Sequence, residues 1–337
     1  SDEVMFITVH RVFELWFQVV RRELRSARDL CGAGRVGEQE LSGAVRSLKR
    51  VSAVLLAATH HWPVMETLTT REYLGFRDKL MGASGFQSAQ LRQIEILLGL
   101  DDAERVPLGL EASYKKALEA ADGSPSPSLA RVERQLADRP TLKDAIESWL
   151  VRTPIDGVAH DDPAAEERLD GFVARCLDSH ARDNDGTCAR AVALAAYHED
   201  PAKERARLTG RFEAEKASVR EFLTPADART RRVRAAMVFI ETYRELPLLA
   251  WPRDVVDQTV ALEQAFVLFR QRHARMVERE IGRRVGTGGS AGVEYLDETA
   301  LRYRIFADFW AVRTILLRSA AVPVLEEGDF YGFRHGA

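Results

Sequence analysis

His273 and the glycine-rich stretch that follows it are the residues of this chain best suited to chemistry. His273 lies in a helical pattern over about 254–281, with Phe269 one turn before it. Residues 286–292 then read Gly-Thr-Gly-Gly-Ser-Ala-Gly, and the backbone amides of such a run can converge on an anion. The pattern indicates a metal-binding histidine beside an anion-binding loop. A core histidine with a hydrogen-bond partner fits the same residues.

His10 is the second histidine with an unusual setting, because it shares a predicted helix face with Phe6 and Phe13. An imidazole that is buried among aromatic side chains needs a hydrogen-bond partner or a ligand. Both a satisfied core histidine and an active-site histidine meet that need. The remaining histidines lie at a helix end, in loops, in charged segments or in the tail, where we expect structural or solvated roles: His60, His61, His160, His180, His198 and His335.

Arg77 is a candidate for binding a carboxylate. It follows Tyr73 by four residues and precedes Leu80 by three, so the three side chains share one face of a predicted helix. An arginine in this setting can hold a buried carboxylate through its planar fork, or it can lie over apolar neighbours at the surface. No order of serine, histidine and aspartate, of paired carboxylates, or of cysteine and histidine indicates a hydrolase.

The elements that must position these residues are helices. No run alternates like a strand over more than a few residues, and the long segments have helical periodicity. We expect helices over about 3–31, 37–62, 86–99, 128–152, 254–281 and 298–319, a charged helical stretch over 164–222 that breaks around 182–187, and breaks near Pro247 and Pro252. Thr69 or Thr70 can cap a further helix that has Glu72 in its first turn. The sequence therefore predicts an all-α fold.

Charge and cysteine content exclude several classes of protein. The chain has 48 basic and 51 acidic residues, for a net charge of −3, which argues against a protein of nucleic acids or membrane surfaces. No apolar run reaches the roughly 18 residues that span a bilayer. Charged residues interrupt the apolar positions of residues 2–20, so no signal peptide is expected. The three cysteines lack metal-ligand spacing and suggest free thiols in the cytoplasm.

Four blocks of the chain, taken in order, carry a resemblance to a known family. They are residues 2–17, with His10 and with Glu-Leu-Trp-Phe at 14–17; residues 73–88, with Phe-Arg and Ala-Ser-Gly-Phe-Gln-Ser; the His273 helix with the Gly-Thr-Gly-Gly-Ser loop; and residues 303–314. These blocks resemble the tryptophan 2,3-dioxygenase family of histidine-ligated haem enzymes. The resemblance covers roughly 2–110 and 228–320, and the middle of the chain aligns poorly.

The resemblance implies a fold, a cofactor and residue roles. The fold would be a helical haem-binding bundle of the tryptophan/indoleamine dioxygenase type, here one domain over 1–337 with a charged helical insertion at about 155–225. His273 would ligate the iron of haem b, and His10 would hydrogen-bond the substrate indole N–H. Arg77 would hold the substrate carboxylate and Thr287 its amino-acid backbone. Further pocket residues implied by the resemblance are Phe6, Tyr73, Leu80 and Ser84 around the indole and the haem, and Gly286 and Gly288 beside the cofactor.

The activity implied by the resemblance is cleavage of the indole C2–C3 bond of L-tryptophan with O2 to give N-formyl-L-kynurenine. Two alternatives share the scaffold: a monooxygenase of secondary metabolism that converts tryptophan or a β-substituted tryptophan to a 2-oxindole, and a haem sensor without catalysis. The family is usually homotetrameric. Its usual segment before the first core helix, whose tyrosines reach a neighbouring subunit, has no counterpart in the printed chain, and Arg11 replaces the usual glutamine.

Overall fold

A computed structural model describes residues 2–80, 88–107, 114–119, 126–284 and 292–332 of the chain. Over these ranges the chain is helical and contains no β-strand, only an isolated bridge between Ile155 and Val158. The all-α prediction is thus confirmed. The chain divides into two compact units, one formed by 1–146 with 257–306 and the other by 147–256 with 307–337. None of the helices in the described ranges combines the length and apolar character that a bilayer crossing requires.

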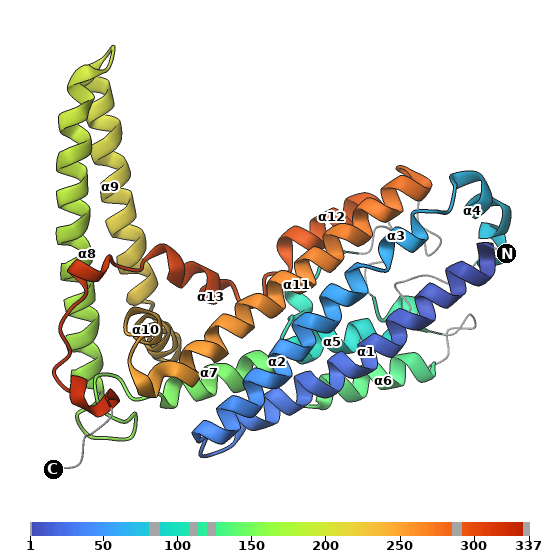
Figure 1. The fold of residues 1–337 in the computed structure, drawn as a ribbon, viewed down its shortest axis with the longest axis horizontal. Helices are drawn as coiled ribbons and strands as arrows, with labels where there is room; N and C mark the ends of the chain where they lie inside the picture. The colour runs from blue at the N-terminus through green and yellow to red at the C-terminus, as the bar shows by residue number, and fades with distance from the viewer. Residues whose placement is uncertain (1, 81–87, 108–113, 120–125, 285–291, 333–337) are drawn as a thin grey trace. The chain divides into compact units, whose positions relative to one another are not determined.

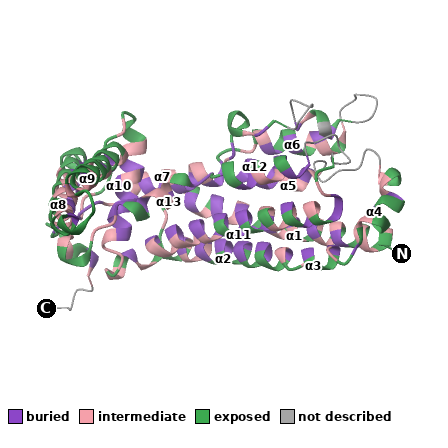
Figure 2. Cartoon of the chain, turned by 90° about the horizontal axis from the view of Figure 1, so that it is seen from above, coloured by how far each residue is buried: buried purple, intermediate pink, exposed green. Residues whose placement is uncertain are grey.

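The first unit is a bundle built around a long N-terminal helix. Helix α1 (Asp2–Gly32) packs against α2 (Glu38–Thr59) and α5 (Ala89–Leu98), and α5 packs in turn against α6 (Pro127–Ala137). Figures 1 and 2 show α1, α2 and the C-terminal part of α11 (Ala250–Ile281) running alongside one another. The short helices α3 (Trp62–Met65) and α4 (Thr70–Arg77) follow α2, and α12 (Val293–Arg302) follows α11.

The apolar face of α1 shows why this bundle forms. Its buried apolar residues recur every three or four positions, so they make one stripe along the helix: Val9, Phe13, Phe17, Val20, Leu24, Ala27 and Cys31. Burial of this stripe removes a large apolar area from water, which is the main favourable contribution to folding. The stripe places His10 at the edge of the core rather than on the solvated face.

Local signals set the ends of the two helices that flank the predicted pocket. Thr69 caps α4: its hydroxyl accepts from the Glu72 amide, and the Glu72 carboxylate accepts from the Thr69 amide at 2.8 Å. Ser88 caps α5 by accepting from the Leu91 amide. Helix α5 ends at Gly99, whose φ of 118° is a left-handed conformation that favours glycine. The predicted cap at Thr69 and the predicted end of a helix near residue 99 are therefore confirmed.

Several predicted helices have different bounds, and the reasons are local. The single helix expected over 128–152 is two helices, α6 and α7 (Leu142–Arg152), because Pro140 lies between them. Helix α8 (Ala165–Leu194) does not break around 182–187; it runs on, and the break comes before Pro201. Pro252 interrupts nothing, because it lies in the first turn of α11, where a proline is tolerated.

The prediction of a single C-terminal helix over 298–319 is also wrong. The chain instead forms α12, then a turn, then α13 (Ala307–Ala311). At the turn, the Phe306 amide donates to the Glu263 carboxylate at 3.0 Å, so it is satisfied by a side chain instead of a helical carbonyl.

The second unit contains a long antiparallel hairpin of α8 and α9 (Pro201–Leu223), followed by α10 (Ala228–Thr242) and α13. Asn184 and Asp185 of α8 bond to Glu215 and Lys216 of α9, which ties the two helices together. The predicted insertion over about 155–225 lies within this unit, and its description as an insertion in a single domain stays a prediction. Short 3-10 helices complete the chain: η1 (Asp78–Leu80), η3 (Asp102–Glu104), η4 (Lys116–Leu118), η5 (Ala195–Tyr197), η6 (Pro247–Leu249), η7 (Val312–Thr314), η8 (Ser319–Ala321) and η9 (Gly328–Tyr331).

Candidate active site

His273 of α11 is a neutral imidazole inside the first unit. Its ring stacks on Trp62 of α3, with 4.7 Å between the ring centroids and 12° between the planes. Burial, together with the nearby groups of His10 and Arg270, lowers the pKa of His273 to about 3, so the ring is uncharged at neutral pH. Neither ring nitrogen forms a hydrogen bond to a group in the described part of the chain. The side chain thus has the charge state and the free lone pair of a metal ligand.

His10 of α1 has a defined tautomer. Its Nδ1 lies 2.7 Å from the Phe6 carbonyl oxygen, and because a carbonyl can only accept, Nδ1 carries the hydrogen. Burial lowers the pKa of His10, although the bond to Phe6 and the charge of Glu14 oppose this. The neutral ring therefore keeps a lone pair on Nε2, which can accept a hydrogen bond from a ligand.

Aromatic rings connect the two histidines. His10 meets the edge of Phe13 at 6.4 Å between centroids, and Phe13 lies 4.4 Å from Trp62, which stacks on His273. Phe269 packs against both Phe13 and Trp62, at 5.7 and 5.3 Å. Helices α1, α3 and α11 thereby bring His10 and His273 to one apolar interior region, as a shared site requires.

Three of the predicted pocket residues meet beside His10. The rings of Phe6 and Tyr73 lie 5.8 Å apart, and Phe76 lies 5.6 Å from Phe6 and 5.5 Å from Tyr73. Leu80 packs against the same cluster, which also contains Leu68, Val277 and Ile281. The predicted residues Phe6, Tyr73 and Leu80 therefore form one apolar wall with the C-terminal end of α11.

Arg77 is the last residue of α4 and is partly buried. It is close enough to Tyr73 to lower the pKa of that phenol, against the larger effect of burial, which raises it. The charge of Arg77 therefore lies at the edge of the apolar wall. Ser84, Gly286, Thr287 and Gly288 fall outside the described residues, so their predicted roles stay predictions.

Two residues that the sequence reasoning missed belong to this region. Trp62 supplies the stacking partner of His273, and Glu280 is a buried carboxylate on α11. For Glu280 a signal exists in the sequence: it follows His273 by seven residues, two helical turns, and so shares its face. For Trp62 no comparable signal exists, because its position depends on the turn between α2 and α3.

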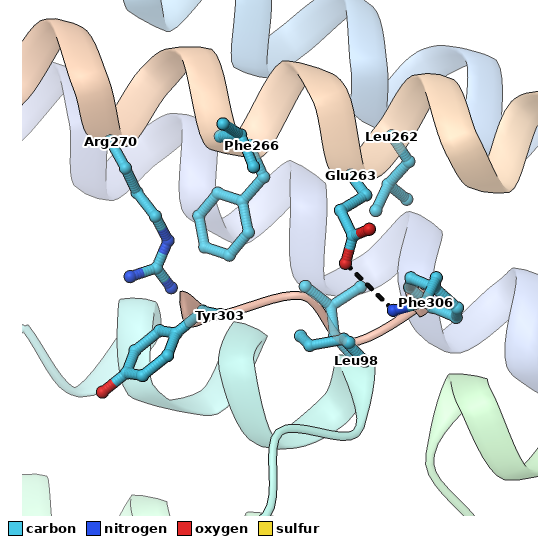
Figure 3. A pocket seen from close by; sticks show the side chains of 9 residues that line it. Leu98, Leu262, Glu263, Phe266, Arg270, Tyr303 and Phe306 are labelled. Carbon is cyan, nitrogen blue, oxygen red and sulfur yellow. Dashed lines mark hydrogen bonds between the residues drawn. The ribbon is translucent and has the colours of Figure 1, made fainter. Parts of the chain in front are cut away.

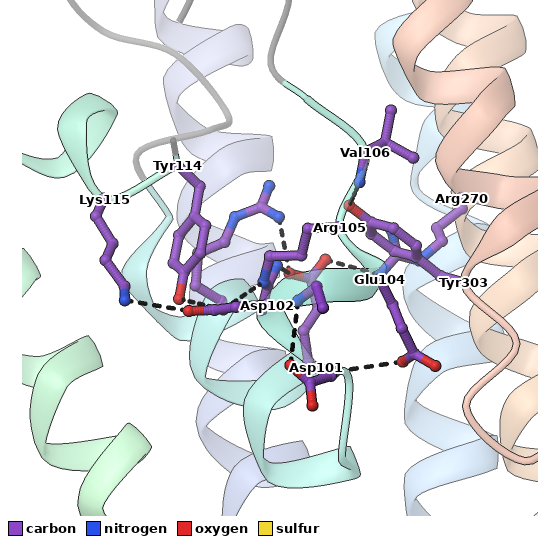
Figure 4. A network of polar contacts seen from close by, with 12 residues as sticks. Asp101, Asp102, Glu104, Arg105, Val106, Tyr114, Lys115, Arg270 and Tyr303 are labelled. Carbon is purple, nitrogen blue, oxygen red and sulfur yellow. Dashed lines mark hydrogen bonds and ion pairs between the residues drawn. The ribbon is translucent and has the colours of Figure 1, made fainter. Parts of the chain in front are cut away.

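A buried charged cluster supports α11 one turn before His273. Glu95 is fully buried and forms ion pairs of 2.7 Å with Arg92, Arg105 and Arg270. Burial alone would raise the pKa of Glu95, but these three guanidinium groups hold it far below its ordinary value. Arg270 lies between the rings of Phe266 and Tyr303, at 4.3 and 4.7 Å from their centroids, and Tyr303 accepts from the Val106 amide (Figure 4). This cluster fixes the helix that carries His273.

The cavity beside this cluster is too small for a substrate. It is lined by Leu98, Glu263, Phe266, Arg270 and Tyr303 among others, and it has room for about one water molecule (Figure 3). We therefore place the candidate active site between His10 and His273 and not at this cavity.

These features define an all-α protein that directs two neutral histidines and an aromatic wall with an arginine at its edge to one interior site. A sequence model described as tryptophan 2,3-dioxygenase matches residues 1–316. The chain belongs to this tryptophan 2,3-dioxygenase family.

Individual relatives agree with the family assignment. The chain is 53% identical to the tryptophan 2,3-dioxygenase of Sorangium cellulosum, over 99% of this chain and 81% of that protein. It is 47% identical to tryptophan 2,3-dioxygenase 2 of Ralstonia nicotianae, over 100% and 91% of the two chains. With the tryptophan 2,3-dioxygenase of Xenopus laevis it shares 30% identity over 96% and 77%.

Proposed function

We propose that the protein is a haem-dependent tryptophan 2,3-dioxygenase, which uses O2 to open the indole ring of L-tryptophan between C2 and C3 and forms N-formyl-L-kynurenine. The observation that carries this proposal is the pair of neutral histidines, His10 and His273, directed to one aromatic interior region. The names of the three relatives given above support the proposed substrate and reaction.

The residues present fit a haem b ligated by His273. Haem iron takes a neutral imidazole nitrogen, and His273 offers one with no hydrogen bond to the described residues. The rings of Trp62 and Phe269 and the side chain of Val277 make the surroundings apolar, as a porphyrin requires. When bound, haem would supply an iron that binds and activates dioxygen. We propose that Gly286 and Gly288 allow the backbone to approach this cofactor closely.

The substrate would be oriented by groups from α1 and α4. His10 Nε2 accepts the indole N–H, because Nδ1 is already committed to the Phe6 carbonyl. The rings of Phe6, Tyr73 and Phe76 and the side chain of Leu80 pack against the indole and exclude water. Arg77 holds the substrate carboxylate, and Thr287 and Ser84 complete the pocket as the sequence predicts. The protein thus contributes chiefly orientation of the substrate toward the oxygen.

Product analysis with labelled dioxygen tests the proposed reaction. The ferrous protein is incubated with L-tryptophan and labelled O2, and the mass and absorbance of the product are measured. Two labelled atoms with the absorbance of an N-formylkynurenine support the proposal. One labelled atom with an intact ring would instead assign a 2-oxindole product, and no turnover despite a normal Soret band would assign a sensor.

Removal of the His273 ring tests the ligand assignment. The variant His273→Ala should purify without haem, because the only proposed protein ligand of the iron is removed. A full Soret band in this variant would remove His273 from the role. His180, which lies on α8 of the second unit, is a matched control, and His180→Ala should keep the Soret band.

We further propose that the protein is a homotetramer of the cytoplasm. The tetramer follows from the family resemblance, and light scattering of the purified protein measures it directly. The three cysteines support a reducing compartment, since Cys31, Cys176 and Cys188 form no disulfide with one another.

A further inference from the structure

Glu280 is a buried carboxylate without a hydrogen-bond partner. Its side chain lies on α11, 4% exposed, and neither carboxylate oxygen has a partner in the described part of the chain. It follows His273 by seven residues, which places it on the same helix face and about 10 Å further along the axis. Burial of a carboxylate is costly unless a donor or a cation satisfies it, so the position calls for a ligand or for a proton.

The ionisable groups close to Glu280 are Glu66 at the end of α3, Glu72 and Tyr73 of α4, and Arg279 of its own helix. Arg279 is the cation among them, but it forms no hydrogen bond with the Glu280 carboxylate. Burial, with smaller contributions from Glu66 and Glu72 and against the charge of Arg279, raises the pKa of Glu280 to about 7.

The charged groups of this neighbourhood are committed elsewhere. The Glu66 carboxylate pairs with Arg272 at 2.8 Å, and the Glu72 carboxylate accepts from the Thr69 amide and hydroxyl. Arg279 is exposed and forms no ion pair with Glu280 within the described residues. The Glu280 carboxylate therefore has no donor among the described residues and is suited to a cationic donor from a ligand.

Glu280 and Arg77 flank the same wall of the proposed pocket. Both act on Tyr73, where Arg77 lowers the pKa of the phenol and Glu280 raises it, after the larger effect of burial. Ile281, the neighbour of Glu280, packs in one cluster with Tyr73 and Phe76. A carboxylate and a guanidinium group on one wall match an α-amino acid, which carries an ammonium group and a carboxylate on one carbon.

We propose that Glu280 binds the α-ammonium group of the amino-acid substrate while Arg77 holds its carboxylate. The inference rests on the proposed function and adds to it a residue that selects for the charged amine. The ammonium group would donate to the Glu280 carboxylate in a charge-assisted hydrogen bond. Both carboxylate oxygens are available for it, because neither has a partner among the described residues.

A pair of ligands that differ only in the ammonium group tests this assignment. Binding of L-tryptophan and of indole-3-propionate is titrated with the intact haem-loaded protein and with Glu280→Gln. The variant should bind L-tryptophan about ten- to a hundredfold more weakly, the effect of losing one charge-assisted hydrogen bond. Its affinity for indole-3-propionate should not change.

Glu263→Gln is the matched control. Glu263 is a carboxylate of the same helix, 3% exposed, that accepts from the Phe306 amide, and a glutamine oxygen can still accept there. This variant should keep the wild-type ratio of the two affinities. An unchanged ratio in Glu280→Gln, or equal losses for both ligands, would overturn the ammonium assignment.

The pH dependence of the wild type gives a second test that needs no variant. Since the ammonium group binds the ionised carboxylate, the affinity for L-tryptophan should fall by up to about tenfold per pH unit below pH 7. The affinity for indole-3-propionate should stay constant near pH 7, and a parallel fall for both ligands would contradict the inference. If the wild type gives labelled product while Glu280→Gln keeps the wild-type ratio, the inference fails and the dioxygenase stands. If the wild type binds neither ligand, both fail.

Discussion

The indole ring of Trp62 lies almost parallel to the imidazole of His273, with 4.7 Å between the centroids and 12° between the planes. A stacked arrangement limits rotation of the imidazole about its side-chain bonds, so Trp62 sets the direction in which the free nitrogen of His273 points. Trp62 itself is 3% exposed and packs against Phe13 and Phe269. The proposed haem ligand is thereby positioned by an aromatic neighbour.

Substitution of Trp62 should affect both stability and haem. Trp62→Ala leaves a cavity in the core and should lower the free energy of unfolding by about 3–5 kcal/mol. Trp62→Phe keeps an aromatic ring, and it loses no hydrogen bond because the indole nitrogen has none to the described residues, so its effect should be smaller. Denaturant unfolding measures the first effect, and the haem content and the Soret position measure the second. Equal losses for the two variants would argue against the stack.

The pH dependence of ligand binding should report His10. Burial lowers the pKa of His10 from the ordinary imidazole value of 6.5, so the ring gains its proton at a lower pH than a solvated histidine does. Nε2 accepts a hydrogen bond only while the ring is neutral. The affinity for indole-3-propionate, which lacks the group proposed to bind Glu280, should therefore decrease at low pH with a midpoint below 6.5. A decrease centred at or above pH 6.5 would contradict the assignment.

His10 and His273 could be selected as candidates from the sequence, but their contacts with distant segments could not be predicted. The spacing of Phe6, His10 and Phe13 predicts one helix face, and α1 confirms it, because helical periodicity is a local property. Contacts between segments far apart in the chain, such as the stack of Trp62 on His273, depend on how helices pack and leave no local signal. For the same reason Glu95 gives no sign of its ion pair with Arg270, 175 residues further along the chain, whereas its pair with Arg92 on the same helix is local.

Helix interruptions show the same limit. The charged segment expected to break around 182–187 is continuous, because pairing with α9 stabilises a stretch of α8 whose intrinsic helix propensity is low. The single helix expected over 298–319 is divided, because the Phe306 amide bonds to Glu263 instead. Tertiary contacts decide both cases.

Arg77 should contribute to substrate binding through its planar fork. Arg77→Ala should weaken binding of L-tryptophan by about 2–5 kcal/mol if the carboxylate pair is desolvated. Arg77→Lys keeps the charge but loses the bidentate geometry, so an intermediate loss is expected. Arg71 lies on the exposed side of the same helix, and Arg71→Ala should leave the dissociation constant unchanged. An unaltered KM in Arg77→Ala would exclude Arg77 from the site.

Glu95 should be essential for the stability of the first unit. Its removal deprives three largely buried arginine side chains of their shared carboxylate, so Glu95→Ala should cost about 3–5 kcal/mol. Because the folded-state pKa of Glu95 is depressed, its stabilising contribution is present above the unfolded pKa, ordinarily 4.5, and is lost only as the pH falls below it. Urea unfolding should therefore show the full difference between wild type and variant at pH 6 and pH 8.

The exposed ion pair of Arg302 and Glu298 on α12 provides the control for this comparison. Glu298→Gln removes one carboxylate from a solvated pair and should change the free energy of unfolding by less than about 1 kcal/mol. A loss for Glu95→Ala no larger than the control's would show that the buried cluster does not stabilise the unit.

Gly157 should be required for the attachment of the C-terminal segment within the second unit. Its φ of 79° is a conformation that disfavours other residues, and a Cβ there would lie 2.6 Å from Cβ of Glu327. The buried carboxylate of Asp156 accepts from the Glu326 and Glu327 amides at 3.2 and 3.0 Å. The Tyr331 hydroxyl accepts from the Gly157 amide and donates to the Pro154 carbonyl, each at 3.0 Å. The turn and the segment thus depend on one another.

Gly157→Ala should strain the backbone and displace residues 326–331, at a cost of more than about 1 kcal/mol. Proteolysis near the C-terminus should become faster as the segment detaches. Gly210→Ala is the control with the opposite sign: this glycine lies inside α9, where an added Cβ would meet no atom within 4 Å, and the substitution should stabilise by about 0.5–1 kcal/mol. Denaturant midpoints for the two variants should move in opposite directions. In the helix the added Cβ lowers the conformational entropy of the unfolded chain, whereas at the turn it collides with Glu327.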